Sequence, residues 1–168
     1  MKAVVGLGGN LGNPCENIRA ALAAVSNLCG TRLLRQSRYY LTEAVEVREP
    51  QPSYVNCAAE IETALSPNAL LGACLGIESA LGRVRCGYKS PRTVDVDLLL
   101  YEGAGLATDE LTLPHPGILR RAFVLYPLSD LYPKGVALGL DFAGALDEVS
   151  SQRIELFVPD DLRGMEIS

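Results

Sequence analysis

Hydrophobic and polar positions change their spacing along the first hundred residues in a way that predicts strands and helices in turn. Ala3 to Leu7 is a short apolar run ended by glycines, which is typical of a buried strand. Asn13 and Pro14 suit the cap and the first turn of a helix, and Gly30 suits its end. Between them apolar side chains recur at helical spacing: Ile18, Leu22, Val25 and Leu28.

The alternation of patterns continues as far as residue 101. Residues 32–42 and 54–64 predict two strands, separated by a charged loop that contains proline. Ser66 begins a helix that we expect to end near Leu81, and residues 93–101 predict a further strand. The order strand, helix, strand, strand, helix, strand is typical of the ferredoxin-like βαββαβ fold. We therefore expect an α+β protein with an antiparallel sheet flanked by helices.

The pattern is weaker in the last third of the chain. A turn-rich stretch at residues 113–116 precedes a short helical segment that ends near Leu131, and residues 133–168 predict no defined element. A chain of 168 residues has the usual length of one domain. We expect a single domain over residues 1–168, with a core at about 3–132 and a tail, 133–168, that packs as a peripheral element.

Composition and charge argue against several classes of protein. The chain has 15 Lys and Arg against 20 Asp and Glu, whereas domains that bind nucleic acid are usually basic overall. The apolar run at the N-terminus is too short for a signal peptide, and no apolar run approaches the roughly 20 residues of a transmembrane helix. We expect a cytoplasmic protein without nucleic-acid or membrane partners.

Two aspartates in the last predicted strand carry the strongest chemical signal. Side chains two residues apart on a strand point to one face, so Asp95 and Asp97 project together. Adjacent carboxylates repel each other unless a cation or a proton lies between them, and Mg²⁺ binds through a few carboxylate oxygens plus phosphates and water. Taken alone, the pair fits two solvated side chains on an exposed face equally well.

A cluster of cations precedes the aspartates. Arginine matches phosphate oxygens with paired donors, so a cluster beside a carboxylate pair indicates a metal–phosphate site. Taken alone, the cluster also fits a solvated loop. The four cations lie within ten residues that contain no acid: Arg83, Arg85, Lys89 and Arg92.

The glycine-rich start, Gly6–Gly12, resembles a dinucleotide-binding loop but does not fit its pattern. The third glycine stands at position 12, where the pattern requires position 11. No Gly-Lys-Ser or Gly-Lys-Thr occurs either, so the chain has no P-loop, and phosphates would be held by side chains and metal. We interpret the segment as a tight turn from strand to helix.

His115 is the only histidine, and cations and an aromatic residue follow it closely. A lone histidine is more often structural than functional. Of the residues after it, Arg121 and Phe123 are candidates for the site, whereas we expect Arg120 to be solvated.

Taken together, these segments resemble the 6-hydroxymethyl-7,8-dihydropterin pyrophosphokinase family over roughly residues 3 to 132. Each segment is a weak signal alone, but their combination in this order is specific. The matching segments are Gly8–Gly12, Tyr54–Ala58, Glu78 with Gly82–Arg85, Pro91–Asp97, and Leu113–His115 with Arg121–Phe123.

The resemblance implies a reaction of folate synthesis. In it the hydroxymethyl oxygen of the pterin attacks the β-phosphorus of the co-substrate ATP, and AMP leaves. It also implies two Mg²⁺ ions held by Asp95 and Asp97, with Arg83 and Arg92 as further catalytic residues. The implied nucleotide-binding residues are Leu71, Glu78, Arg85, Thr112, His115 and Arg121. The implied pterin-binding residues are Thr42, Val45, Tyr54, Asn56 and Phe123, and Asn10 would support the pterin pocket.

The sequence departs from the family in two loops. Lys89-Ser90 stand where the family often has an aromatic residue and a glycine, so either Tyr88 or the stem of Lys89 would make the aromatic contact. Thr42-Glu43-Ala44 replaces Thr-x-Pro, which predicts a less rigid loop.

Two rival interpretations remain at this point. A non-catalytic ferredoxin-like module for RNA or a regulatory ligand would display aromatic residues on its central strands, where this chain has Asp95 and Asp97. A relative that binds pterin without transfer is the second, although all the implied metal and phosphate residues are present. We expect the protein to be a monomer.

Overall fold

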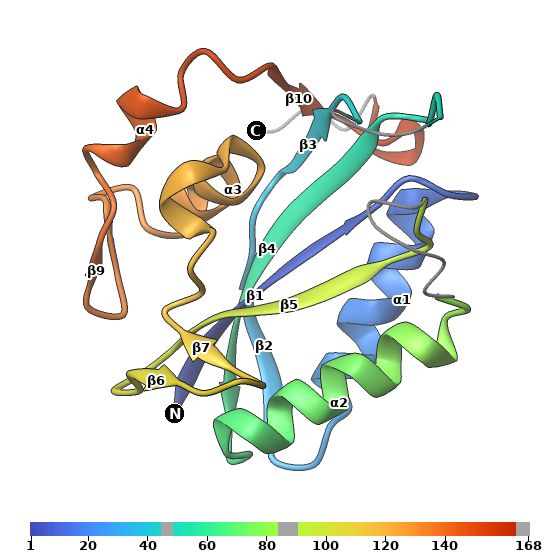
Figure 1. The fold of residues 1–168 in the computed structure, drawn as a ribbon. Helices are drawn as coiled ribbons and strands as arrows, with labels where there is room; N and C mark the ends of the chain where they lie inside the picture. Colours follow the sequence, from blue (N-terminus) through green and yellow to red (C-terminus); the bar gives the residue numbers. More distant parts are fainter. Residues whose placement is uncertain (45–48, 84–90, 164–168) are drawn as a thin grey trace.

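Six strands of the described residues form one antiparallel sheet at the centre of the fold (Figure 1). The computed structural model describes residues 1–44, 49–83 and 91–163. In space the strands follow the order β10, β3, β4, β1, β5, and β2 also pairs with β4. Their bounds are β1 Lys2–Gly9, β2 Thr31–Gln36, β3 Tyr39–Thr42, β4 Tyr54–Thr63, β5 Asp95–Tyr101 and β10 Ile154–Phe157.

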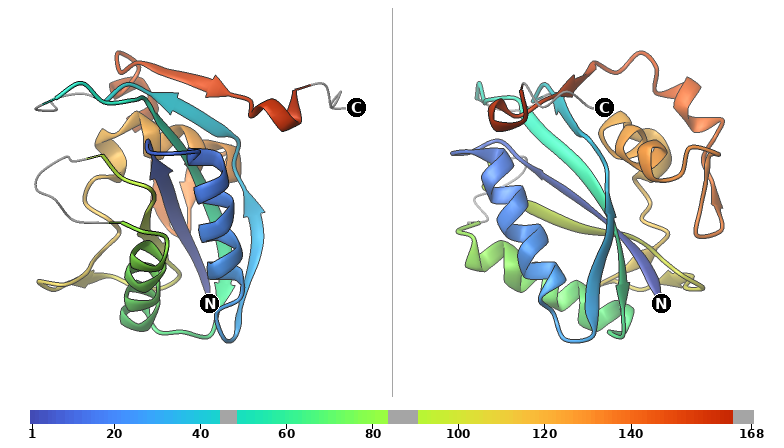
Figure 2. Two further views of the ribbon diagram at one scale, coloured as in Figure 1. Left: turned by 90° about the vertical axis from the view of Figure 1, so that its right-hand side faces the viewer. Right: turned by 180° about the vertical axis from the view of Figure 1, so that it is seen from behind.

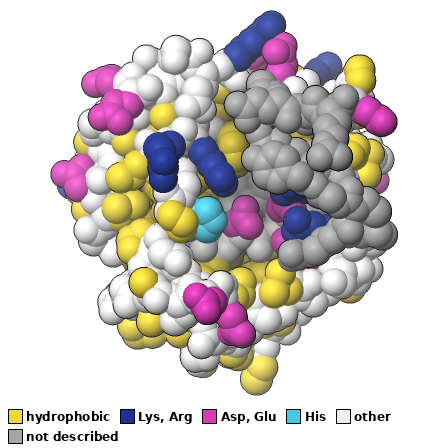
Figure 3. Space-filling view, viewed as in Figure 1, with side chains coloured by type: hydrophobic (Ala, Val, Ile, Leu, Met, Phe, Trp, Pro, Cys, Tyr) yellow, Lys and Arg dark blue, Asp and Glu magenta, His cyan; other side chains and the backbone are white. Residues whose placement is uncertain are grey.

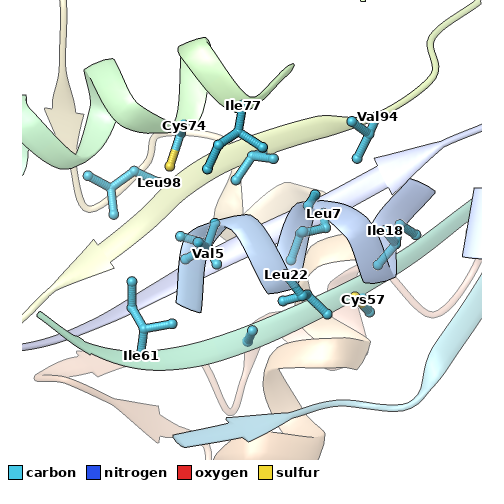
Figure 4. Close-up of a cluster of buried hydrophobic side chains, with 14 of the residues drawn as sticks. Val5, Leu7, Ile18, Leu22, Cys57, Ile61, Cys74, Ile77, Val94 and Leu98 are labelled. Atoms are coloured by element: carbon cyan, nitrogen blue, oxygen red, sulfur yellow. The ribbon is translucent and has the colours of Figure 1, made fainter. Parts of the chain in front are cut away.

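Helices cover both faces of this sheet (Figure 2). On one face lie α1 (Pro14–Ser26) and α2 (Pro67–Ala80), and on the other α3 (Ala122–Leu131) and α4 (Ala145–Glu148). Strand β1 serves both layers, because Val5 packs with α1 and α2, whereas Val4 packs with α3. Figure 4 shows the larger core, in which side chains of α1 and α2 meet those of the central strands.

The two long helices begin where the sequence predicts. The Oδ1 atom of Asn13 accepts a hydrogen bond from the Glu16 N–H at 3.2 Å, and Pro14 occupies the first turn. Ser66 caps α2 in the same way, because its Oγ accepts from the Ala69 N–H at 3.3 Å. Both N-terminal predictions are confirmed.

The strand predicted at 32–42 is two strands, because Ser37 interrupts the ladder with β4. Gln36 lies opposite Ala59 and Tyr40 opposite Asn56, so β4 faces one extra residue. The Ser37 hydroxyl accepts a hydrogen bond from the Ala58 N–H at 2.8 Å, in place of a strand carbonyl. The prediction of one continuous strand was wrong, since a side chain took over a backbone role.

The tail is part of the sheet and of the core. Strand β10 pairs with β3, with Ile154 opposite Thr42, and Phe142 and Val149 pack in the core beneath α3. The prediction of a merely peripheral tail was wrong for this part of the chain. The shorter elements are β6 Leu106–Ala107, β7 Thr112–Leu113, β8 Val136–Ala137, β9 Leu140–Asp141 and 3₁₀ turns at Ile118–Arg120 and Asp160–Leu162.

The structure thus combines helices with an antiparallel sheet, as the α+β prediction requires. Within residues 1–44, 49–83 and 91–163, every helix is too short or too polar to span a bilayer.

Candidate active site

A cleft of about 910 Å³ opens beside the central strands, between the ends of β1, β3, β4 and β5 and the start of α3. Ligand pockets commonly have volumes of about 300–1,000 Å³, so a small organic substrate fits. Figure 3 shows acidic and basic side chains around a hollow next to the histidine. The lining includes Thr42, Tyr54, Asn56, Arg92, Asp95, Asp97, Arg121 and Phe123.

The two aspartates face the cleft from β5, as their spacing predicts. Their neighbours Val94, Val96 and Leu98 are buried in the core beneath α1 and α2. Asp95 and Asp97 instead line the cleft on the opposite face of the sheet. Partial loss of hydration in the cleft, followed by the charge of Asp95, raises the pKa of Asp97 above its ordinary value although its side chain is exposed, and neighbouring arginines only partly oppose this.

Strand β1 forms the floor of the cleft with residues that lack side chains. Gly6 lies opposite Asp97, and Gly8 lies opposite Asp95. A Cβ on Gly8 would lie 2.7 Å from Oδ1 of Asn56, so the glycine makes room for that side chain. The interpretation of Gly6–Gly12 as a turn was wrong for its first residues, which belong to the strand.

Ion pairs gather two of the four predicted cations, Arg83 and Arg92, around Asp95. The Arg83 Nη1 lies 2.5 Å from Asp95 Oδ1 and 2.5 Å from Glu78 Oε2, and Arg92 pairs with the other oxygen of Asp95. The buried Glu78 also accepts a hydrogen bond from the Val96 N–H at 2.8 Å, and burial raises its pKa. Glu78 therefore fixes Arg83 against β5.

Asn10 connects the cationic side of the cleft with the loop before Tyr54. Its side chain is buried, and its Oδ1 accepts from the Arg92 N–H at 2.9 Å. Its Nδ2 donates to Gln51 Oε1 at 3.1 Å and to the Pro52 carbonyl at 3.0 Å. One amide therefore joins Arg92 to the loop before β4, and the predicted support of a pterin pocket by Asn10 stays a prediction.

Polar and aromatic groups line the other end of the cleft. The Asn56 Nδ2 donates to Thr42 Oγ1 at 3.0 Å, which fixes the orientation of this buried amide. Tyr54 is half-buried, and its hydroxyl donates to Gln51 Oε1 at 3.3 Å. Phe123 remains 37% exposed although it is a large apolar side chain, so its ring is available to a ligand.

His115 and Arg121 both lie against Gly117 beside the cleft. The His115 Nδ1 accepts from the Gly117 N–H at 3.0 Å, while the backbone N–H of His115 donates to the Leu99 carbonyl at 2.9 Å. Burial and the charge of Arg121 lower the pKa of His115. The Arg121 guanidinium lies against Gly117 and 5.8 Å from the centre of the Phe123 ring.

The cleft thus has carboxylates and arginines at one end and aromatic and amide groups at the other. The sequence that forms it also matches a known family. Residues 4–133 match the family of 7,8-dihydro-6-hydroxymethylpterin-pyrophosphokinase. The match covers more than half of the chain. The chain belongs to this hydroxymethylpterin pyrophosphokinase family.

Named relatives agree with this assignment. The chain is 38% identical over 154 residues to a 2-amino-4-hydroxy-6-hydroxymethyldihydropteridine pyrophosphokinase of Methylorubrum extorquens, covering 92% of this chain and 97% of that protein. It is 43% identical over 132 residues to the protein of the same name in Pseudomonas aeruginosa, covering 79% and 81%. It is also 39% identical to the folic acid synthesis protein fol1 of Schizosaccharomyces pombe, covering 92% of this chain but only 21% of that longer protein.

A solved structure shares the fold. A crystal structure of HPPK-DHPS in complex with substrates matches with a TM-score of 0.63 and 12% identity, over 88% of this chain and 45% of that chain. At this identity the likeness concerns the fold alone.

Some of the residues that the family resemblance implies line the cleft, whereas others are linked to it only through a neighbour or lie elsewhere. Arg83 and Glu78 reach it through Asp95, and His115 through Arg121. Leu71 packs against the larger core and Thr112 is exposed on β7, and neither lines the cleft. The predictions for Val45, Arg85, Tyr88 and Lys89 fall outside the described residues.

Several cleft residues escaped the sequence analysis. Arg120 is exposed, as expected, but it also lines the cleft, which we did not expect. The tail contributes Ser151, Gln152 and Arg153, for which no motif or periodicity gave a signal. The alternating glycines Gly6 and Gly8 were visible in the sequence, and their two-residue period could have identified an open floor under a strand.

Proposed function

We propose that this protein transfers a pyrophosphoryl group from ATP to 6-hydroxymethyl-7,8-dihydropterin in folate synthesis. The hydroxymethyl oxygen forms a bond to the β-phosphorus of ATP, the bond from this phosphorus to the oxygen bridging it to the α-phosphorus breaks, and AMP leaves with that oxygen. The hydroxyl proton is released. One observation carries the proposal: a single cleft unites the carboxylate–arginine cluster around Asp95 with the aromatic and amide groups near Asn56.

The donor set at β5 fits Mg²⁺. Asp95 and Asp97 provide two carboxylates on one face, and the charge of Asp95 contributes to the raised pKa of Asp97, a repulsion that a cation would relieve. Mg²⁺ takes its remaining ligands from phosphates and water, so a third protein carboxylate is not needed. We propose two ions here, held by Asp95 and Asp97. When bound, they would neutralise the triphosphate charge and polarise the reacting phosphorus.

The arginines would orient the phosphates. Arg83 and Arg92 already lie on either side of Asp95, so a triphosphate entering this cluster would exchange carboxylate contacts for phosphate contacts. Glu78 holds Arg83 from behind, which limits its freedom before the phosphates arrive. Orienting the reacting groups in this way lowers the entropic cost of transfer.

The opposite end would bind the pterin. Tyr54 and Phe123 would stack on the flat heterocycle, and the amide of Asn56, fixed by Thr42, would bond its polar edge. Val45 is proposed for the same pocket. On the nucleotide side we propose Arg121, His115 and Glu78 with the further residues Leu71, Arg85 and Thr112.

The finer features of the fold and setting are also proposals. The spatial order β3, β4, β1, β5 and the order of helices and strands along the chain support a ferredoxin-like core. We propose that residues 1–168 fold as one domain, and that the protein is a cytoplasmic monomer that binds no nucleic acid.

Release of AMP tests the function. We expect AMP to form from ATP only when the hydroxymethyl dihydropterin and Mg²⁺ are present. Asp95→Ala should lower turnover by several orders of magnitude, because it removes a proposed metal ligand and the partner of both arginines. Asp109→Ala, in the exposed turn between β6 and β7, is the matched control and should leave turnover unchanged.

Two results would contradict the proposal. AMP formation that does not depend on the pterin would exclude the proposed acceptor. Binding of both substrates without any AMP would identify a pterin-binding relative that does not catalyse transfer.

A further inference from the structure

Helix α3 carries Arg121 and Phe123 at its start, where its own sequence provides little support. The first four N–H groups of a helix have no partner within it, and Arg121 at the N-cap makes no side-chain capping bond. Pro127 lies inside the helix and has no N–H, so it cannot donate to the Phe123 carbonyl four residues earlier. The turn that presents two proposed substrate contacts therefore depends on partners elsewhere in the chain.

Gln152 is such a partner. Its Oε1 accepts from the Ala122 N–H at 2.9 Å, and its Nε2 donates to the Arg120 carbonyl at 2.8 Å. One side-chain amide thereby fixes the peptide groups on both sides of Arg121. Because one contact needs an acceptor and the other a donor, only one orientation of the amide satisfies both.

The same segment is also tied to the opposite wall of the cleft. The Arg153 Nη1 lies 2.7 Å from Glu43 Oε1, and Ile154 pairs with Thr42 where β10 meets β3. Thr42 and Glu43 line the cleft, as do Gln152 and Arg153. Residues 152–154 therefore link the end of β3 to the start of α3.

We infer that Gln152 is a positioning residue that holds Arg121 and Phe123 in their substrate-binding geometry. The inference rests on the proposed function for what is bound. Without the Gln152 side chain, the turn at residues 120–122 samples other conformations. If only a fraction of the molecules keeps the binding conformation of this turn, the apparent dissociation constant of the pterin rises by the inverse of that fraction.

Three substitutions and one control test the inference. Gln152→Leu removes both hydrogen bonds at similar volume, and Gln152→Asn keeps an amide that is too short to reach both partners. Gln152→Glu keeps an acceptor for the Ala122 N–H, where a negative charge near a helix N-terminus is favourable, but cannot donate to Arg120. Ser150→Ala, two residues away and outside the cleft lining, is the control.

Calorimetry with the hydroxymethyl dihydropterin, in the presence of Mg²⁺ and a non-hydrolysable ATP analogue, measures the effect. We expect the dissociation constant of the pterin to rise about tenfold in Gln152→Leu and Gln152→Asn. Gln152→Glu should recover part of the loss, because it keeps the contact with the Ala122 N–H but not the one with the Arg120 carbonyl, and Ser150→Ala should match the unchanged protein. A purely structural role would lower the melting temperature without this rescue pattern.

Hydrogen exchange of the Ala122 amide in the ligand-free protein provides a second readout that needs no substrate. Protection should fall in the Leu and Asn variants and persist in the Glu variant. Unchanged protection, or unchanged pterin affinity in both Gln152→Leu and Gln152→Asn, would overturn the inference. An unsubstituted protein that binds no pterin would overturn the proposed function instead, and the exchange measurement would still decide whether Gln152 holds the turn.

Discussion

At the scale of single residues, glycines decide how close a ligand can come to β5. A Cβ on Gly8 would meet Oδ1 of Asn56 at 2.7 Å, and a Cβ on Gly9 would meet the Thr93 carbonyl at 2.3 Å. The second contact is with backbone, which cannot move without shifting the segment that carries Arg92. The first is with a side chain, so its loss can be tested with less risk to the fold.

We expect Gly8→Ala to lower the affinity for the pterin about tenfold, because Asn56 must leave its hydrogen bond to Thr42. The affinity for an ATP analogue should change much less. The matched control is Gly72→Ala, where no atom outside the neighbouring residues and backbone of α2 lies within 4 Å of the added Cβ. As an exposed position inside α2, it should raise the free energy of unfolding by about 1 kcal/mol and leave pterin binding intact. Calorimetry that gave equal pterin affinity for both variants would disprove this role of Gly8.

His115 should be neutral at pH 7 with its proton on Nε2. Its Nδ1 accepts from the Gly117 N–H, and burial together with Arg121 lowers its pKa below the ordinary 6.5. Below pH 6.5 the imidazole takes up a second proton more readily in the unfolded chain than in the folded protein. The contribution of His115 to the free energy of unfolding is therefore lost as the pH falls. Nitrogen-15 NMR of the imidazole measures both the position of the proton in the neutral form and the pKa of His115. A proton on Nδ1 in the neutral form, or a pKa of 6.5 or higher, would contradict the assignment.

At the scale of elements, the bulge at Ser37 sets the direction of β3 and hence the position of Thr42. We expect Ser37→Ala to lower the free energy of unfolding by about 1–3 kcal/mol, because the buried Ala58 N–H loses its acceptor. Urea unfolding measures the change, and Ser150→Ala serves as an exposed control. A loss in Ser37→Ala no larger than in the control would mean that water or backbone satisfies the Ala58 N–H.

The elements that the sequence predicted well are those whose signals are local. Strand β1, helices α1 and α2 and the Asp95–Asp97 face follow from periodicity and caps within a few residues. The break at Ser37 and the strand β10 depend on partners far away in the sequence. The start of α3 is likewise hydrogen-bonded to Gln152, which lies 30 residues beyond Ala122 and belongs to no motif.

At the scale of the whole molecule, ionic groups fasten α3 to the sheet. Asp130 of α3 pairs with Arg38, with a shortest distance of 2.7 Å, and accepts from the Tyr40 hydroxyl at 3.0 Å. Arg35 of β2 donates to the Leu131 carbonyl at 2.6 Å and pairs with the buried Glu60. These contacts keep the wall that carries Phe123 against the strands that carry Asn56.

The stability of this attachment should depend on pH. Burial alone would raise the pKa of Asp130, but Arg38 and Tyr40 lower it below its ordinary 3.8. The contribution of ionised Asp130 to the free energy of unfolding is therefore complete above its pKa in the unfolded chain. It is lost as the pH falls through its pKa in the folded protein. We expect the decline in the free energy of unfolding between about pH 5 and pH 3 to be less steep in Asp130→Asn. An identical slope in both proteins would show that Asp130 is not the group responsible.

We propose that the hydroxymethyl oxygen attacks the β-phosphorus of ATP within the cleft bounded by Asp95, Asp97 and Asn56. Phosphorus-31 NMR of one reaction containing ATP, Mg²⁺ and the hydroxymethyl dihydropterin identifies the phosphorus that is attacked. We expect the ATP signals to be replaced by those of AMP and of a pyrophosphate ester of the pterin, in equal amounts. ADP with a monophosphate ester would place the attack at the γ-phosphorus, and unchanged ATP would mean no transfer at all. Either result would contradict the proposed transfer.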